Sequence, residues 1–233
     1  MVSLKSLPKD YRAIVLGSTG GIGKAFVDLL MLDENCGEVI EFSRSTWPAI
    51  NFQDETTIKN AAQSIDGEAH VIIDATGFLS DEIITPEKSI KTLDPQNMTK
   101  LFELNALGPA LLMKHFTQLM PRRERSIFAT LSARVGSIGD NSLGGWYSYR
   151  ASKAALNMFL KCTAIEVSRN KKEAICVALH PGTVETSLSD PFASERERFT
   201  PQHSVSQMLE VLDGLSAEQT GTFWDYKGDA IEW

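Results

Sequence analysis

Short apolar runs alternate with segments of helical periodicity along the whole chain. The apolar runs cover residues 12–16, 39–42, 49–52, 70–75, 126–131, 174–179 and 222–225, and their lengths are typical of buried strands. Helical spacing covers residues 23–32, 54–65, 94–120 and 147–168, with Pro109 predicting a boundary or kink in the third segment. Continuous apolar strands that alternate with helices predict a parallel sheet covered on both faces.

Length and composition favour a single domain. The chain has 233 residues, of which 42% are hydrophobic, and this is enough for one sizeable core. We therefore predict an α/β fold: a three-layer, Rossmann-type, doubly wound parallel sheet that spans residues 1–233. We expect residues 12–130 to form mainly its cofactor-binding half. Residues 131–233 should form the catalytic and substrate-binding half, with a lid at about 187–201.

Charge and cysteine usage exclude several other classes of protein. The net charge of −7 argues against nucleic acid or an anionic membrane as the main partner. No apolar run approaches the ~20 residues of a membrane span, and residues 1–10 lack the apolar core of a signal peptide. Cys36, Cys162 and Cys176 form no C-x-x-C pair, so we expect buried free thiols in a reducing compartment. These features predict a cytoplasmic protein.

A glycine-rich turn follows the first apolar run directly. Residues 17–23 read G-S-T-G-G-I-G. Gly17 permits a tight turn, Gly21 lets the backbone approach a pyrophosphate, and Gly23 lets the helix pack closely on the strand. The helix N-terminus supplies amides and partial positive charge, to which Ser18 and Thr19 can add hydroxyl donors. The pattern predicts a dinucleotide site, and a simple strand–helix turn is the alternative.

A tyrosine and a lysine four residues apart provide the second signal. Residues 149–153 read Y-R-A-S-K, which places Tyr149 and Lys153 one turn apart on one helix face. A free tyrosine has a pKa near 10, and a nearby ammonium favours the phenolate. The alternative is a packed Tyr149 and a solvated Lys153, because such pairs are common on helices. The glycine turn about 130 residues earlier favours an enzyme that moves hydride.

Five ordered motifs resemble the short-chain dehydrogenase/reductase superfamily over almost the whole chain. The family's T-G-x-x-x-G-x-G corresponds to residues 16–23, with Leu16 in place of the threonine. Its N-N-A-G corresponds loosely to residues 74–77, its N-x-x-G to residues 105–108, its Y-x-x-x-K to residues 149–153 and its P-G-x-x-x-T to residues 181–186. Residues 136–141 and 226–233 are similar to a narrower group, the C-factor-like reductases, named for a bacterial cell–cell signalling protein.

The resemblance implies a set of site residues. Tyr149 would exchange a proton with the substrate oxygen, while Lys153 would lower its pKa and bind the nicotinamide ribose. Asn105 would support the active-site helix and a proton-relaying water. Cofactor binding would fall to Gly17, Ser18, Thr19, Gly21, Ile22, Gly23, Arg44, Ala75, Gly77, Tyr149, Lys153, Pro181, Gly182, Val184 and Thr186. No residue is assigned to a metal.

The catalytic serine is where the sequence departs from the family. The family reads S-S-x-x-G after the fifth strand, and its second serine polarises the substrate carbonyl. Here residues 132–136 read S-A-R-V-G, which puts Ala133 at that position and Ser132 one residue early. A one-residue shift reverses the face in a regular strand, although a bulge can bring the side chain round. Ser132 stays a candidate, and Ser137 offers another hydroxyl.

Residues after the second apolar run bear on the choice of cofactor. An acidic residue commonly follows this strand in NAD enzymes, where it binds the ribose diol. Here Arg44 stands between Ser43 and Ser45, while Glu41 lies inside the strand. A guanidinium matches phosphate geometry, so we predict NADP(H) rather than NAD(H). Asn51 replaces the aspartate common near the adenine.

These observations favour an NADP(H)-dependent oxidoreductase that acts on a small-molecule carbonyl or alcohol substrate. A dinucleotide-binding signalling or scaffold protein with little catalysis is the alternative, and Ala133 keeps it open. A sugar-nucleotide epimerase is a third reading, although the chain leaves little room for a larger substrate domain.

Apolar residues run around most of the helix at 147–168, which predicts a homo-oligomer. The lid at 187–201 mixes aromatic and charged residues and indicates no substrate preference.

Overall fold

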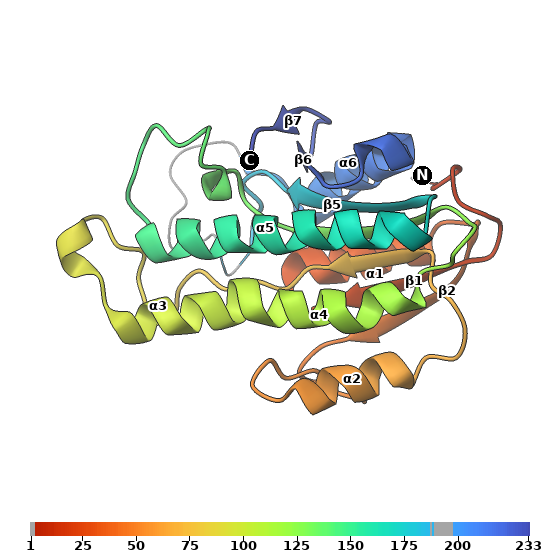
Figure 1. Cartoon of the computed structure of the whole chain (residues 1–233), viewed down its shortest axis with the longest axis horizontal. Coiled ribbons are helices and arrows are strands. Elements are labelled where there is room, and N and C mark those ends of the chain that lie inside the picture. The colour runs from red at the N-terminus through yellow and green to blue at the C-terminus, as the bar shows by residue number, and fades with distance from the viewer. Residues whose placement is uncertain (1–2, 187, 189–197) are drawn as a thin grey trace.

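The computed structural model describes residues 3–186, 188 and 198–233, and its centre is a seven-stranded sheet (Figure 1). The strand order is β2-β1-β3-β4-β5-β6-β7. The strands are β1 Tyr11–Leu16, β2 Cys36–Phe42, β3 Val71–Asp74, β4 Ser126–Leu131, β5 Ala174–His180, β6 Thr222–Asp225 and β7 Ala230–Ile231. All neighbouring strands pair in parallel except β6 and β7, which are antiparallel. The predicted doubly wound α/β fold is confirmed.

Helices cover both faces of the sheet. The helices α1 Gly21–Met31 and α6 Pro201–Gly214 pack together on one face, whereas α2 Glu55–Gln63, α4 Gly108–Phe116 and α5 Tyr147–Asn170 lie on the other (Figure 1). Alternate residues of a strand pack into the two helix layers, because successive side chains point to opposite faces of the sheet. In β1, Ala13 and Val15 enter the core beneath α1 and α6, while Ile14 and Leu16 enter the core beneath the other three helices.

The segment predicted as one long helix at 94–120 is divided in the structure. The helix α3 Pro95–Phe102 leads into a π-helical turn at Glu103–Leu107, which precedes α4 and a 3-10 turn at Thr117–Leu119. Pro109 has no N–H to donate to the carbonyl four residues earlier, which explains why the regular helix is interrupted here. The predicted boundary at Pro109 is confirmed, and Asn105 lies inside the widened turn.

Three elements differ from the sequence prediction. Residues 49–52 form no strand, because Asn51 makes only an isolated bridge with Asp54, the residue that caps α2. The helix α6 and the two-residue strand β7 were not predicted. Among the cysteines, Cys176 is buried as expected, but Cys162 is exposed on α5. The described residues include no helix long and apolar enough to cross a membrane.

The strand order creates a crevice at the carboxyl ends of β1 and β3. The chain leaves β1 toward β2 on one side and returns to β3 on the other, so the direction of winding reverses at β1. Such a switch point is where open α/β sheets bind ligands. The amide of Ala75, just after β3, donates to the carbonyl of Leu16 at 2.8 Å, which joins the two strand ends. The glycine turn and the loop after β3 therefore lie side by side.

Candidate active site

Close backbone contacts build the glycine turn between β1 and α1. Gly17 has a φ of +82°, and a Cβ there would lie 3.1 Å from the carbonyl carbon of Ala75. A Cβ on Gly23 would lie 2.1 Å from the carbonyl oxygen of Gly17, so only glycine allows α1 to begin this close to β1. Gly20 precedes α1 and has no side chain that could cap the helix. The first amides of α1 can therefore donate hydrogen bonds to a bound anion.

A cavity of about 490 Å³ extends from this turn along the sheet edge. Its walls come from the glycine turn, the loop after β2, the segment before α2, the loop after β3 and the end of α3, and they include Gly17, Thr19, Arg44, Asn51, Phe52 and Gly77. The Oγ atom of Ser18 is buried at the turn and has no hydrogen-bond partner among the described residues. An unpaired buried hydroxyl and a crowded glycine cradle fit the phosphate groups of a dinucleotide.

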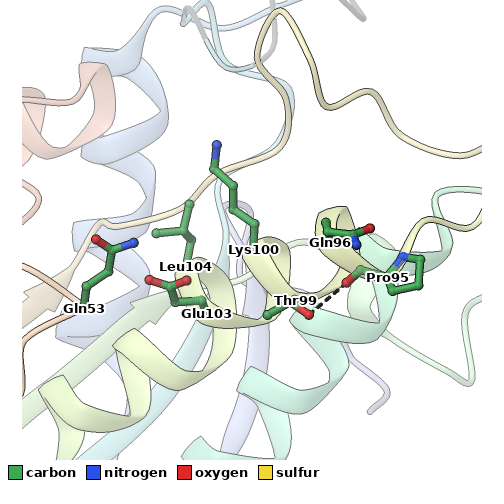
Figure 2. Close-up of a pocket in the computed structure, with 7 residues that line it drawn as sticks. All are labelled: Gln53, Pro95, Gln96, Thr99, Lys100, Glu103 and Leu104. Carbon is green, nitrogen blue, oxygen red and sulfur yellow. Dashed lines mark hydrogen bonds between the residues drawn. The ribbon is translucent and has the colours of Figure 1, made fainter.

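A second cavity of about 400 Å³ lies beside the first (Figure 2). It shares Gln53, Lys100, Glu103 and Leu104 with the larger cavity, and Pro95, Gln96 and Thr99 complete it. Figure 2 shows Gln53 on one side and Glu103 with Leu104 on the other. The groove therefore continues beyond Phe52 and Gln53 along α3.

Tyr149 and Lys153 both lie in the buried part of the first two turns of α5. Their side chains are 7% and 3% exposed, respectively. The Lys153 ammonium donates to the carbonyl oxygen of Leu131 at 2.9 Å, so it is anchored at the end of β4. A Cβ on Gly77 would lie only 3.6 Å from Nζ of Lys153, which shows that the lysine reaches the cavity wall after β3.

Burial governs the pKa values of this pair. It lowers the pKa of Lys153 to about 8, against the opposing effect of the buried Asp74 carboxylate. Burial raises the pKa of Tyr149, so the lowering that we expected from Lys153 is not found. Tyr149 therefore carries its proton throughout the neutral range, and its hydroxyl is a proton donor there.

Asn105 connects the π-helical turn to the loop after β3 and to α5. Its side-chain oxygen accepts from the amide of Phe78 at 2.8 Å, and its nitrogen donates to the carbonyl of Phe78 at 2.8 Å and to Oγ of Ser152 at 3.2 Å. Gly77 is the adjoining residue, and a Cβ there would lie 3.8 Å from the Asn105 oxygen. Asn105, Gly77 and Lys153 thus lie close together in the structure.

The two residues at the serine position face different surroundings. The Ser132 hydroxyl donates to the side-chain oxygen of Asn157 on α5 at 2.7 Å. Ala133 instead packs in an apolar cluster that contains Tyr149. The other hydroxyl considered, that of Ser137, is buried and accepts from the amide of Asp140 at 3.0 Å. Ala133 therefore shares the surroundings of Tyr149.

The apolar cluster around Tyr149 was not predicted as a feature of the site. Its buried members are Leu79, Ile84, Leu101 and Tyr149, and Phe78, Ala133, Val135, Trp146 and Leu188 pack against them. Most of it comes from the loop after β3 and from the loop after β4, which follow motifs that the sequence did reveal. The predicted lid at 187–201 contributes Leu188, while residues 187 and 189–197 lie outside the described part of the chain.

The turn after β5 closes the site on the side of the glycine turn. Gly182 has a φ of +78°, and a Cβ there would lie 2.9 Å from the ring of Tyr226. Val184 forms a bridge with Phe199, which holds the described end of the predicted lid. Thr186 lies against the start of α1, because a Cβ on Gly21 would approach its methyl group within 2.9 Å. The last residue of the P-G-x-x-x-T motif thus meets the first motif of the chain.

The sheet order, the glycine cradle and the buried Tyr149–Lys153 pair together define a Rossmann-type α/β protein with a groove at the ends of β1 and β3. A sequence model of the short chain dehydrogenase family matches residues 47–197. The chain belongs to this family, whose members are oxidoreductases, and the predicted superfamily is confirmed.

Named relatives and solved structures agree with this family. The chain is 35% identical to the C-signal of Myxococcus xanthus over 141 residues, which cover 60% of this chain and 81% of that protein. It is 29% identical to the 1-hydroxy-2-glutathionyl-2-methyl-3-butene dehydrogenase of a Rhodococcus strain, over 80% of this chain and 79% of that protein. The structure of NADPH-bound carbonyl reductase from chicken fatty liver is 25% identical and superposes with a TM-score of 0.84, covering 98% and 97% of the two chains.

Proposed function

We propose that this protein is an NADP(H)-dependent reductase that transfers hydride between the nicotinamide and a carbonyl or alcohol substrate. The observation that carries the proposal is the buried Tyr149–Lys153 pair, whose lysine meets Gly77 at the wall of the cavity. The NADPH-bound carbonyl reductase that superposes on the chain supports the reaction class. When bound in the groove, the dinucleotide supplies or accepts the hydride.

Tyr149 is the proton donor in the direction of reduction. Burial raises its pKa, so the hydroxyl is protonated at neutral pH and can give its proton to a carbonyl oxygen that gains negative charge. Lys153 carries a positive charge below pH 8 and stabilises the phenolate that results. Asn105 fixes the loop after β3 against α5 and so keeps Gly77 beside the lysine.

The groove holds the cofactor through the residues that the motifs identify. Ser18 and the first amides of α1 would bind the pyrophosphate, and Arg44 at the cavity wall would bind the 2′-phosphate. Phe52 would pack against the adenine, because it lines the cavity and its ring is held close to Gly108, where a Cβ would come within 2.2 Å of it.

The proposal is tested by following NADPH oxidation with a panel of aldehydes and ketones, in the wild type and in Tyr149→Phe. We expect turnover with at least one carbonyl, and loss of nearly all of it in the variant, while NADPH binding measured by fluorescence stays the same. Near-wild-type turnover of Tyr149→Phe would refute the role of this residue.

The alternative is a dinucleotide-binding signalling protein with little catalysis. Its support is the replacement of the usual serine by Ala133 together with the similarity to the C-signal. The same panel separates the two functions, since the alternative predicts tight NADPH binding without turnover of any carbonyl or, in the reverse direction, of any alcohol.

A further inference from the structure

The loop that follows β3 is attached to the start of α5 through one buried carboxylate. Glu87 is 6% exposed, and its hydrogen-bond partner Ser148 lies 61 residues later in the sequence. One carboxylate oxygen accepts from the amide of Ser148 at 3.2 Å, and the other accepts from the Ser148 hydroxyl. The backbone carbonyl of Glu87 accepts from the amide of Trp146. Three donors at the beginning of one helix thus converge on a single residue.

This arrangement replaces the local cap that α5 lacks. Trp146 precedes the helix, and an indole offers no acceptor to the first helical amides. Those amides need a partner, and a carboxylate is favoured there by the helix dipole. The charge of Glu87 is in turn tolerated in its buried position because it receives these hydrogen bonds. Helix and loop therefore stabilise each other directly before Tyr149.

The same loop forms the apolar wall of the candidate site. Near its start, Asp81 accepts from the amide of Ile84 at 2.7 Å and from Lys100 at 2.9 Å. Leu79 and Ile84 are 4% and 3% exposed and pack in the cluster that contains Tyr149. The loop is thus anchored to α3 through Asp81 and to α5 through Glu87, and the wall against Tyr149 lies near the first anchor.

We infer that Glu87 is a positioning residue, which caps α5 from the loop 79–93 and so fixes Tyr149 relative to the apolar wall of its pocket. The inference rests on the proposed function only in taking Tyr149 as the proton donor. Without the cap, the first turn of α5 loses acceptors for its amides and the loop loses its second anchor. Both sides of the pocket then move independently, and the geometry of proton transfer is lost.

Hydrogen exchange on the full-length protein tests the attachment directly. The variants are Glu87→Ala, Glu87→Gln and, as a matched control, Glu82→Ala, since Glu82 is an exposed carboxylate in the same loop. We expect Glu87→Ala to exchange about tenfold faster than the wild type both in the loop 79–93 and at residues 147–150. Glu87→Gln should lie between, because its carboxamide oxygen still accepts from the Ser148 amide. Glu82→Ala should match the wild type.

Kinetics on a carbonyl from the panel test the positioning role. We expect Glu87→Ala to lower kcat about tenfold or more, because small displacements of a reacting group are costly. The affinity for NADPH should stay within about twofold, since Glu87 is not part of the cavity wall. Glu87→Gln should recover part of kcat, and Ser148→Ala, which keeps the amide donor, gives the same comparison where Glu87→Ala fails to fold.

Two results would overturn the inference: unchanged exchange at residues 147–150 in Glu87→Ala, or faster exchange with an unchanged kcat. Failure of the proposed function looks different. In that case the wild type turns over no carbonyl or alcohol, while exchange still responds to Glu87→Ala and not to Glu82→Ala, which supports Glu87 as the residue that fixes the Tyr149 segment.

Discussion

Ser132 donates its hydroxyl hydrogen to the side-chain oxygen of Asn157, one helical turn beyond Lys153, at 2.7 Å. Asn157 also donates to the carbonyl of Gly136 at 3.4 Å, so it holds both ends of the short segment that carries Ala133. Lys153 holds the preceding carbonyl, that of Leu131. The Ser132 hydroxyl therefore helps to attach the end of β4 to α5, while the Ala133 side chain packs in the cluster that contains Tyr149.

We expect Ser132→Ala to be less damaging to turnover than Tyr149→Phe. The Ser132 hydroxyl is engaged with Asn157, so its loss should cost stability, roughly 1 kcal/mol for one buried hydrogen bond, more than catalysis. Steady-state kinetics and thermal unfolding of both variants make the comparison. Equal losses of activity would mean that Ser132 polarises the substrate after all and that our register of this strand end is wrong.

The reciprocal variant Ala133→Ser supplies a matched test. A serine at 133 adds one hydroxyl where the family's motif places it, in the cluster around Tyr149. One well-placed donor at a developing oxyanion is worth about 10²-fold or more in enzymes that use one. We expect kcat to rise in Ala133→Ser, and an unchanged or lower kcat would show that position 133 does not face the substrate oxygen.

Much of the fold and of the candidate site followed from sequence patterns of short range. The strands at residues 126–131 and 222–225 were predicted with their observed bounds. The first is buried along its whole length, as a continuous run in a parallel sheet is expected to be. The sequence motifs also contain Asn105, Gly77 and Lys153, which lie close together in the structure.

What could not be predicted depends on long-range contacts. Residues 49–52 are apolar like a strand, yet they turn into α2 because Asp54 caps that helix. Nothing near Glu87 in the sequence indicates that it caps a helix 61 residues later. The raised pKa of Tyr149 is a consequence of its burial, which a sequence does not reveal.

We expect NADPH to bind more tightly than NADH, with Arg44 responsible for the difference. Arg44 lies at the cavity wall, in a loop ordered by the bond from the Ser43 amide to the Thr46 hydroxyl at 2.7 Å. Arg44→Ala should lose about tenfold in NADPH affinity and little in NADH affinity, because only NADPH carries the 2′-phosphate. Fluorescence titration of both cofactors measures this. Arg44→Lys is the control that keeps the charge without the bidentate geometry. Equal wild-type affinities, or no loss in Arg44→Ala, would contradict the assignment.

The reduction rate should fall as the pH rises through about 8. Burial lowers the pKa of Lys153 to about 8, so the ammonium that stabilises the phenolate is lost above that value. The same group makes folding more favourable with rising pH between about 8 and its ordinary value of about 10.4, because burial penalises only its charged form.

Burial moves the pKa values of Tyr149 and His180 away from this range. It raises the pKa of Tyr149 and lowers the pKa of His180 to about 4. His180 is therefore neutral between pH 6 and pH 10. A profile of kcat from pH 6 to 10 checks the prediction. A rate that stays constant up to pH 10 would exclude Lys153 as the group that controls it.

We expect the protein to form a homodimer or tetramer through the outer face of α5. Met158 and Ile165, which are two helical turns apart, and Phe159 next to Met158 are 64%, 49% and 39% exposed, so the described part of the chain does not bury them. An exposed apolar row of this kind is typical of an interface, and an isologous contact would pair it with its own copy.

Sedimentation at micromolar concentration should give a multiple of the 25.7 kDa chain mass. Phe159→Glu should shift the protein to the monomer, because a buried unpaired charge opposes association, whereas Glu166→Gln on the same helix should not. A wild type that sediments as a single monomeric species would show that this row is covered in another way.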